Sequence, residues 1–247
     1  VGGLIGETSN EGVIIENCYA LGDVTGTGDT VDSVNNIGGL IGRAGSGEIR
    51  DSYAKGEVSV PQDSRGSGNI GGLVGRLEND VNIINCYAEG DVSGNHNEGM
   101  GGLVGCGLGT IKNSYALGTV KSYGEVVQLG GLVGYGLGTI KNSYALGEVI
   151  INYDGDREPD VVAGGLIGRV EYKAEVENCY AAGPVTDQST EGVRDEDNIG
   201  GLVGHNDNID ETTNSYYDED TTGQSSSDGG TGLSTAEMMQ ETTFASW

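Results

Sequence analysis

The sequence predicts an all-β protein, a parallel β-solenoid (β-helix) of seven coils of about 29–36 residues with a short C-terminal capping helix. Three observations lead to this fold. One repeat recurs along nearly the whole chain, apolar and polar residues alternate within it, and the last 30 residues depart from it. Repeats of this length are typical of architectures in which each unit buries its apolar face only against its neighbours.

The first block of each repeat reads Gly-Gly-Leu, then Ile or Val, then Gly. Its seven copies start at Gly2, Gly38, Gly71, Gly101, Gly130, Gly164 and Gly200, with spacings of 36, 33, 30, 29, 34 and 36 residues. The block is apolar at both odd and even positions, so we expect one strand that is covered on both faces. Glycine inside such a strand indicates that another backbone approaches closely.

The second block reads Asn-(Cys/Ser)-Tyr-Ala-x-Gly-x-Val, with Asp51 in place of Asn once and an altered tail in the last copy. Period-two alternation predicts that Cys18 and Ala20 point inward with the following Val, and that Tyr19 points outward. Ile15 should also point inward, and the two phases conflict at Asn17. A bend at Asn resolves the conflict because Asn tolerates the left-handed conformation. The Asn side chains either serve only as turns or stack as a ladder from coil to coil.

Each repeat is therefore expected to form one coil of two or three short strands that pair in parallel and in register with the next coil. The segment from each Tyr to the next Gly-Gly varies from 14 to 20 residues, so insertions should collect along one side of the solenoid. A seven-bladed propeller is the competing architecture. Its blades take ~40 or more residues, whereas the shortest repeat here has 29.

The segment 218–247 is expected to cap the solenoid of residues 1–217. A polar stretch runs to Gly232 and reads as a loop. Ser234 and Glu237 then form a capping box that opens a short helix through about Glu241. A cap protects the last coil from edge-to-edge pairing. Since Val1 lies inside a repeat, the chain is expected to be a fragment of a longer secreted or anchored protein.

Composition excludes several partners. The chain has 38 acidic and 12 basic residues and a net charge of −26, which would repel a phosphate backbone and so argues against a nucleic-acid partner. No apolar run approaches the ~20 residues of a membrane span, so no membrane insertion by this segment is expected. A chain this acidic has the composition of a halophile's exported protein.

The recurring GGLVG followed by TIKNSYALG resembles the GLUG motif, which is found in repeat tracts of bacterial and archaeal surface proteins, adhesins and IgA-peptidase-type proteins. The resemblance covers residues 1–217, and the tail from Asp218 resembles segments that close such arrays. It implies an extracellular or cell-surface setting and a β-solenoid, but no activity. Family members with peptidase activity carry it in another domain, and no His-Glu-x-x-His motif occurs here.

The expected function is non-enzymatic: an adhesin-like stalk or ligand-display scaffold that contacts a cell-surface glycan or protein. Two alternatives remain open. The chain could be the self-assembling subunit of a virion fibre or surface appendage, with copies of itself as partner. It could also be a carbohydrate-active β-helix enzyme, because solenoids host such enzymes.

The candidate ligand-binding residues form an outward row with one Tyr in each coil. They are Tyr19, Tyr53, Tyr87, Tyr115, Tyr144 and Tyr180. Exposed aromatic rings can stack on sugar rings as well as on each other. In the alternative, inserted loops or Leu21, Leu117 and Leu146 cover the row and make it a second small core.

Calcium is the candidate cofactor. Asp154, Asp156 and Asp160 cluster in the longest insertion, and Asp218 and Asp220 resemble the start of a cation loop. Position twelve of that loop is Gly229 rather than Glu, so it is no EF-hand. The alternative is that these carboxylates are solvated surface charge.

The cysteines do not form a predicted disulfide framework. Cys18, Cys86 and Cys179 occupy the same inward position two or more coils apart, beyond the ~7 Å that a bridge allows between Cα atoms. Cys106 is expected to be a thiol in a turn.

Overall fold

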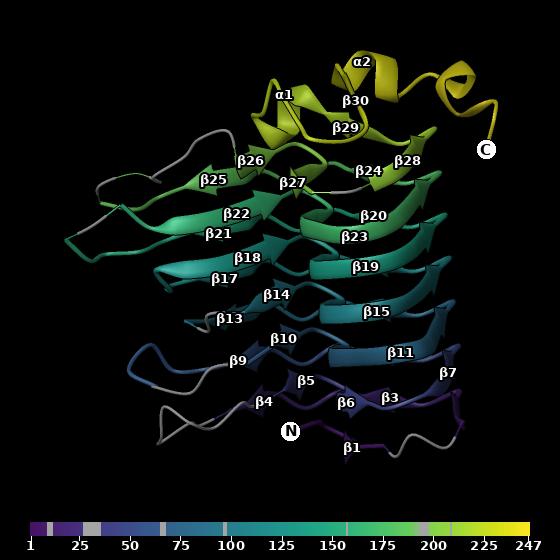
Figure 1. The fold of residues 1–247 in the computed structure, drawn as a ribbon, viewed down its shortest axis with the longest axis vertical. Helices are drawn as coiled ribbons and strands as arrows, with labels where there is room; N and C mark the ends of the chain where they lie inside the picture. The colour runs from purple at the N-terminus through teal and green to yellow at the C-terminus, as the bar shows by residue number, and fades with distance from the viewer. Residues whose placement is uncertain are drawn as a thin grey trace.

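The computed structural model describes residues 1–8, 12–26, 36–64, 68–95, 98–156, 158–190, 192, 198–207 and 209–247. Within them the chain winds through seven coils that stack along the long axis, from the N-terminus to a C-terminal cap (Figure 1). Every pairing between coils is parallel, and equivalent residues lie opposite each other, as in Ala88 with Ala116. The predicted parallel β-solenoid is confirmed.

Four sheets run along the solenoid, and five of the seven coils contribute to all of them, so the two or three strands expected per coil were too few. The strands of the first sheet are β1 (Ile5–Glu7), β2 (Val13–Glu16), β6 (Ile41–Ala44), β7 (Gly47–Arg50), β11 (Val74–Ile84), β15 (Val104–Lys112), β19 (Val133–Lys141), β23 (Ile167–Glu177), β27 (Val203–Asn206) and β28 (Ile209–Thr213). Those of the second are β5 (Ile37–Gly38), β10 (Ile70–Gly71), β14 (Gly99–Gly101), β18 (Val126–Gly130), β22 (Asp160–Gly164) and β26 (Ile199–Gly200).

The third sheet carries the Tyr-Ala pair of the first six repeats and Tyr216-Tyr217 of the seventh. Its strands are β3 (Tyr19–Ala20), β8 (Tyr53–Ala54), β12 (Tyr87–Ala88), β16 (Tyr115–Ala116), β20 (Tyr144–Ala145), β24 (Tyr180–Ala181), β29 (Tyr216–Asp218) and β30 (Thr231–Leu233). Those of the fourth are β4 (Val24–Thr25), β9 (Val58–Ser59), β13 (Val92–Gly94), β17 (Val120–Ser122), β21 (Val149–Ile151) and β25 (Val185–Asp187).

The Gly-Gly-Leu block is a corner, and its prediction as one strand is wrong. In the second repeat β5 ends at Gly38, Gly39 and Leu40 form a bend, and β6 begins at Ile41. The block is apolar throughout because the strands on both sides of the corner, β5 and β6, place side chains inside the solenoid. Leu40 and Ile41 point into one core and Ile37 into another.

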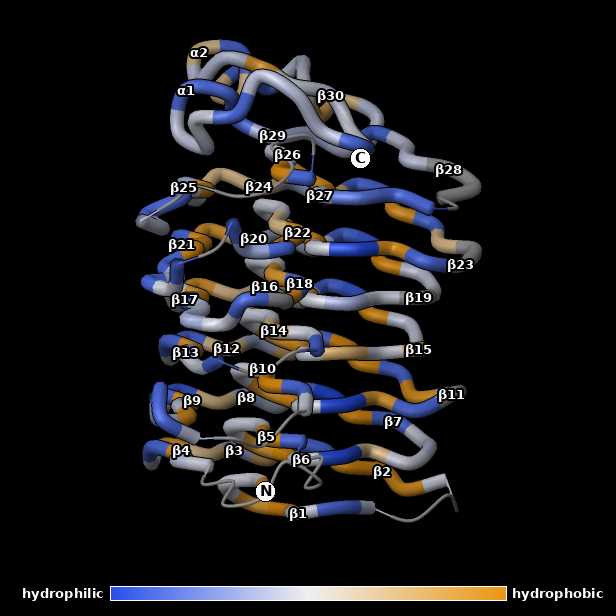
Figure 2. Tube along the Cα trace, turned by 60° about the vertical axis from the view of Figure 1, so that its left-hand side comes forward, coloured by the Kyte–Doolittle hydropathy of each residue, from blue (hydrophilic) through white to orange (hydrophobic). Residues whose placement is uncertain are grey.

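Two apolar cores run along the solenoid, separated by a narrow waist. One holds the Leu of every Gly-Gly-Leu block except the first, and the other holds the Val that ends the second block in the first six repeats. At the waist a Cβ on Gly39 would lie 2.9 Å from the Cβ of Ala54 and 2.2 Å from the carbonyl oxygen of Gly72. The close approach expected from the small residues is confirmed there, and the apolar positions recur in every coil (Figure 2).

The second block bends at Asn, as predicted. Asn17, Asp51, Asn85, Asn113, Asn142, Asn178 and Asn214 have φ between 47° and 54°. The bend lets both flanking segments bury their apolar residues. Ile15 and Ala20 are buried, whereas Tyr19 is 57% exposed.

The C-terminal segment covers the last coil with more structure than the expected loop and helix. Helix α1 (Glu219–Thr222) follows β29, β30 pairs with β29, and α2 (Thr235–Met238) precedes the 3-10 turn η2 (Glu241–Phe244). The predicted capping box of Ser234 and Glu237 is present, but α2 ends at Met238 rather than near Glu241.

Polar residues of the cap satisfy the backbone of the last coil. Ser227 Oγ accepts hydrogen bonds from the amides of Leu202 and Val203, at 3.1 and 2.8 Å. Tyr217 replaces the Ala of the other coils and packs its ring beside Gly201. These contacts occupy an edge that would otherwise be open to another strand.

The variable connections lie on one side of the solenoid, as expected (Figure 1). They join the fourth sheet to the second and include residues 60–64, 123–125 and 152–156.

Candidate functional site

The predicted tyrosines form one continuous column on the outer face of the third sheet. From Tyr19 to Tyr180 their rings stack with centroids 4.8–5.3 Å apart and planes within 13° of parallel. The in-register pairing of the strands imposes this spacing, because neighbouring strands lie ~4.7–4.9 Å apart. Residues that are about 30 positions apart in sequence thus become adjacent.

The leucines beside the tyrosine column do not form a buried second core over it. Leu21, Leu117 and Leu146 lie two residues after a Tyr on the same face and are themselves 58, 39 and 42% exposed. Most of the column is half-buried, since each ring is covered chiefly by its neighbours. Its C-terminal end is different: Phe244 and Trp247 pack against Tyr180, with centroids 6.4 and 6.0 Å away.

The stacking limits what a ligand can touch. Because the planes are nearly parallel and face along the solenoid axis, each internal ring turns its faces toward the rings above and below. A sugar ring therefore cannot stack on an internal tyrosine of the column. A ligand lying along the column meets ring edges and phenol groups, and an internal ring offers it hydrogen bonding rather than face-to-face stacking.

The phenols are hydrogen-bond donors at neutral pH. Burial raises the pKa of Tyr115, Tyr144 and Tyr180 above the ordinary value of the phenol. In the second coil Lys55 Nζ lies 5.5 and 5.6 Å from the ring centroids of Tyr53 and Tyr87 and pairs with Glu89 at 2.9 Å. This end of the column is therefore charged, whereas Leu117 and Leu146 border it in the fourth and fifth coils.

An amide ladder runs beside the tyrosine column, which decides between the two readings of the Asn residues. Asn85 Nδ2 donates to Asp51 Oδ1 at 3.0 Å, and each following Asn donates to the one before it. The further distances are 3.1 Å for Asn113 to Asn85, 3.0 Å for Asn142 to Asn113, 3.1 Å for Asn178 to Asn142 and 3.5 Å for Asn214 to Asn178. The outer face thus carries parallel lines of phenols and amides.

The structure places the predicted calcium residues in two settings. Asp154, Asp156 and Asp160 are exposed. Asp218 is 4% exposed and is the N-cap of α1, and it accepts hydrogen bonds from the amides of Asp220 and Thr221 and from Thr235 Oγ1. Among the described residues no three His, Cys, Asp or Glu side chains are grouped to hold a metal ion. Calcium binding stays a prediction.

Three of the four cysteines, Cys86, Cys106 and Cys179, are buried. Burial raises the pKa of Cys86 and Cys106 to about 11 and that of Cys179 to about 12. All four cysteines are free. Cys106 lies inside β15 rather than in a turn, and that expectation is wrong. It aligns in register with Arg76 in one neighbouring coil and Tyr135 in the other.

Among the recesses formed by the described residues, two that were not predicted adjoin features already discussed. One, of about 290 Å³, lies at Cys106. The small Cys106 side chain stands there between the longer side chains of Arg76 and Tyr135 in the neighbouring coils. The other, of about 310 Å³, lies at the C-terminal end of the tyrosine column, between Tyr180 and Trp247. Sequence alignment of the repeats shows the small residue at Cys106, but the position of Trp247 depends on how the tail folds back.

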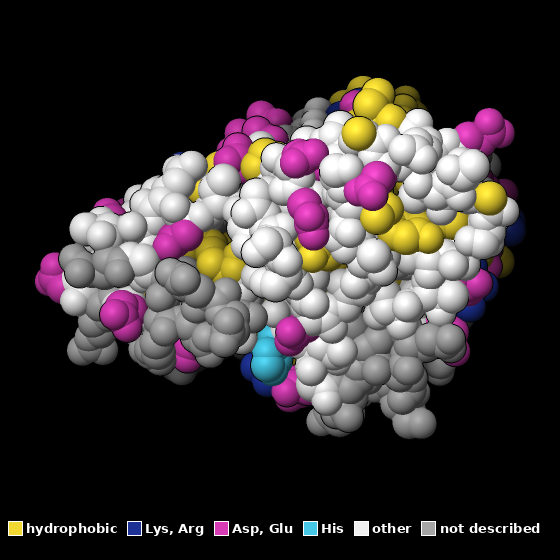
Figure 3. Space-filling model, turned by 90° about the horizontal axis from the view of Figure 1, so that it is seen from above, with side chains coloured by type: hydrophobic (Ala, Val, Ile, Leu, Met, Phe, Trp, Pro, Cys, Tyr) yellow, Lys and Arg dark blue, Asp and Glu magenta, His cyan; other side chains and the backbone are white. Residues whose placement is uncertain are grey.

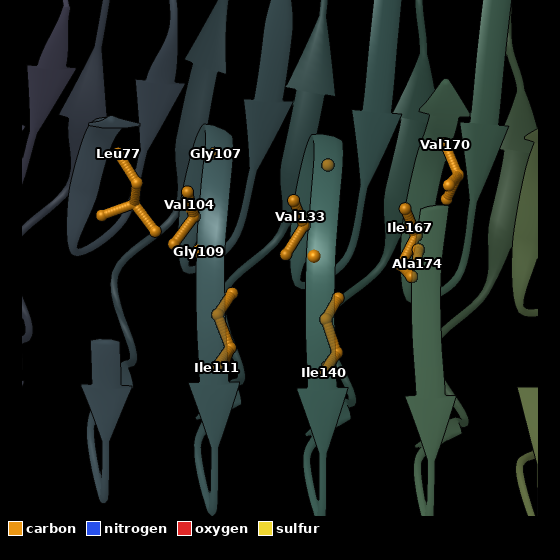
Figure 4. A pocket seen from close by; sticks show the side chains of 12 residues that line it. Leu77, Val104, Gly107, Gly109, Ile111, Val133, Ile140, Ile167, Val170 and Ala174 are labelled. Carbon is orange, nitrogen blue, oxygen red and sulfur yellow. The ribbon is translucent and has the colours of Figure 1, made fainter. Parts of the chain in front are cut away.

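An internal cavity of about 10 Å³ lies in the core between β11 and β23. Figure 4 shows its lining: Leu77 and Val170 project side chains from the flanking coils, whereas Gly107 contributes none. Gly136 is its equivalent in the fifth coil. The lining is apolar and the volume is no more than one water molecule needs, so it is packing space rather than a ligand site.

None of the described helices is long and apolar enough to cross a membrane. The profile of the family described as the GLUG motif matches residues 33–59, 66–93, 96–121 and 161–186. Each of these segments spans one repeat, from its Gly-Gly-Leu block through its Tyr-Ala block, in the second, third, fourth and sixth coils.

Several curated proteins are similar to parts of the chain. Halomucin of Haloquadratum walsbyi is 33% identical over 138 residues, 51% of this chain. A Gly-rich membrane protein of Evansella cellulosilytica is 43% identical over 89 residues, 34% of the chain. An immunoglobulin A1 protease of Streptococcus pneumoniae is 33% identical over 94 residues, 38% of the chain. The aligned regions span only 2, 10 and 5% of these relatives. No solved structure matches the chain.

Proposed function

Because the chain carries repeats of the GLUG motif, we propose that it acts outside the cell or at the cell surface, as a non-enzymatic stalk that displays a periodic binding face. Its relatives support this setting, since one is named a membrane protein and another acts, by its name, on immunoglobulin A1. The strongly acidic composition is compatible with an exported, salt-exposed protein.

The observation that carries the proposal is the in-register outer face. Each outward position of the repeat recurs at the strand spacing, so phenols and amides form two straight lines along the solenoid. The two apolar cores and the cap hold these lines in place. An extended partner with regularly spaced hydroxyls, such as a linear glycan, can follow such lines with repeated hydrogen bonds.

Glycan binding is tested on a broad glycan array with the labelled chain, at low and high salt. The double variant Tyr115→Phe/Tyr144→Phe removes two phenol groups and keeps both rings stacked. We expect saturable binding that this variant weakens by about tenfold, corresponding to about 1.4 kcal/mol for two lost hydrogen bonds. Tyr123→Phe is the control, because Tyr123 lies outside the column, near Lys121.

The remaining outcomes separate the alternatives. Absence of glycan binding under all conditions would contradict the display role and leave a passive spacer. Binding that a chelator abolishes would support calcium at the acidic positions Asp154, Asp156 and Asp160. Sedimentation of the same sample distinguishes a monomer from an assembly of copies.

A further inference from the structure

A recess of about 310 Å³ lies where the tyrosine column meets the C-terminal cap. Its walls are the rings of Tyr180, Phe244 and Trp247 and the side chains of Met238 and Met239. Met239 is 82% exposed and Trp247 43% exposed, so the recess opens to solvent. The lining is mostly apolar, which sets it apart from the polar recess at Cys106.

The three rings that line this recess pack against one another at different angles. Tyr180 is inclined at 56° to Phe244 and at 39° to Trp247, and Phe244 meets Trp247 nearly edge-on at 77°. Here, unlike in the column, rings are not all stacked face to face. The arrangement is held from both sides: Trp247 Nε1 donates to the carbonyl oxygen of Asn214 at 3.0 Å, and Phe244 packs on the edge of Tyr216.

The C-terminal segment that forms most of this recess is acidic. Residues 214–247 contain six carboxylates and no Lys, Arg or His. Asp218 lies in the lining itself, where its carboxylate accepts hydrogen bonds from Thr235. The C-terminal end shows carboxylates dispersed among hydrophobic side chains (Figure 3). A neutral apolar ligand would gain nothing from this charge, whereas a cation would.

We propose that this recess binds alkylated ammonium groups, such as a trimethylammonium head. Rings attract a cation through their electron-rich faces, and the attraction is strongest when the cation is weakly hydrated. Methyl groups on nitrogen spread the charge and also pack against Met238, Met239 and the rings. The carboxylates raise the local concentration of the cation without a direct ion pair being required.

Trp247 makes the test direct, because it is the only tryptophan of the chain. The full chain is titrated with tetramethylammonium and with choline at constant ionic strength, and tryptophan fluorescence is followed. Its neutral counterpart is 3,3-dimethylbutan-1-ol, which has the shape of choline without the charge. We expect saturable changes with both cations and affinity at least about tenfold weaker for the alcohol.

The variant Phe244→Leu retains an apolar wall and removes one ring. We expect it to weaken cation binding by about fivefold or more while thermal unfolding stays near that of the parent chain. Tyr123→Phe, far from the cap in sequence, serves as the matched control. Equal affinity for choline and the neutral alcohol would overturn the proposal, as would the absence of a saturable response to the cations or unchanged affinity in Phe244→Leu.

Discussion

Individual glycines are required where the backbones of neighbouring coils approach closely. The Gly residues of the Tyr-Ala-x-Gly segments form a column in which an added Cβ would clash with the backbone of the neighbouring coil. On Gly118 it would lie 2.1 Å from the carbonyl oxygen of Gly90, and on Gly147 1.9 Å from that of Gly118. Gly136 differs, because a Cβ there would meet only Val133, at 3.0 Å, beside the internal cavity.

These two settings predict opposite outcomes for the same substitution. Gly118→Ala should lower the free energy of unfolding by ~2–3 kcal/mol, because a backbone carbonyl cannot move aside. Gly136→Ala should be neutral or stabilising by up to ~1 kcal/mol, because Ala reduces the entropy of the unfolded chain and fills empty space. Urea denaturation of both variants checks this, and equal destabilisation would contradict the packing described for the cavity.

The Asn at the bend between two strands of each coil has two roles, which the sequence motif alone does not separate. The residue must adopt positive φ, and its amide must join the neighbouring coils. Asn113 does both: its φ is 50°, it donates to Asn85 and it accepts from Asn142. Asp51 keeps the bend and accepts from Asn85, but a carboxylate has no N–H with which to continue the ladder.

Two substitutions at Asn113 separate these roles. Gly keeps the left-handed conformation and removes the amide, and should cost about 1–2 kcal/mol for two partly exposed hydrogen bonds. Ala removes the amide and also resists positive φ, and should cost ~1–2 kcal/mol more than Gly. Thermal unfolding, with Lys112→Ala as an exposed neighbour control, measures the difference. If Ala and Gly were equivalent, the backbone conformation would not limit stability.

The whole molecule carries strong self-repulsion. Its net charge is −26, and part of it is offset locally, as where Arg43 pairs with both Glu7 and Glu78 and Arg169 pairs with Asp207 at 2.8 Å. Arg169 lowers the pKa of Asp207 through its hydrogen bonds. Surface pairs of this kind contribute only ~0–1 kcal/mol each, so uncompensated repulsion outweighs them.

Salt should therefore stabilise the protein. Raising NaCl from about 0.1 to about 1 M shortens the screening length from ~10 to ~3 Å, which weakens the repulsion that spans the solenoid more than the contacts within each ion pair. We expect the Tm to rise by several degrees in calorimetry. Sucrose at matched osmolality is the control for solvent exclusion, and a Tm that falls with NaCl would show that the ion pairs dominate.

The sequence by itself determined the number of coils, their parallel register, the inward and outward positions around Tyr19 and its equivalents, and the bend at Asn17 and its equivalents. These follow from one physical fact: identical residues at a regular interval bury their apolar side chains by stacking coil on coil. The outward placement of Tyr19 and the capping box at Ser234 were equally readable, because each depends on residues only a few positions apart.

Only the tertiary structure decided the corner at Gly39, the waist that divides the core, the direction of the tyrosine faces and the recess beside Trp247. Each depends on the angle between strands of one coil or on contacts between distant segments. Periodicity reports which side chains are buried but not which of two cores receives them. Likewise, the position of Trp247 follows from how the tail folds back on the last coil, through its hydrogen bond to Asn214.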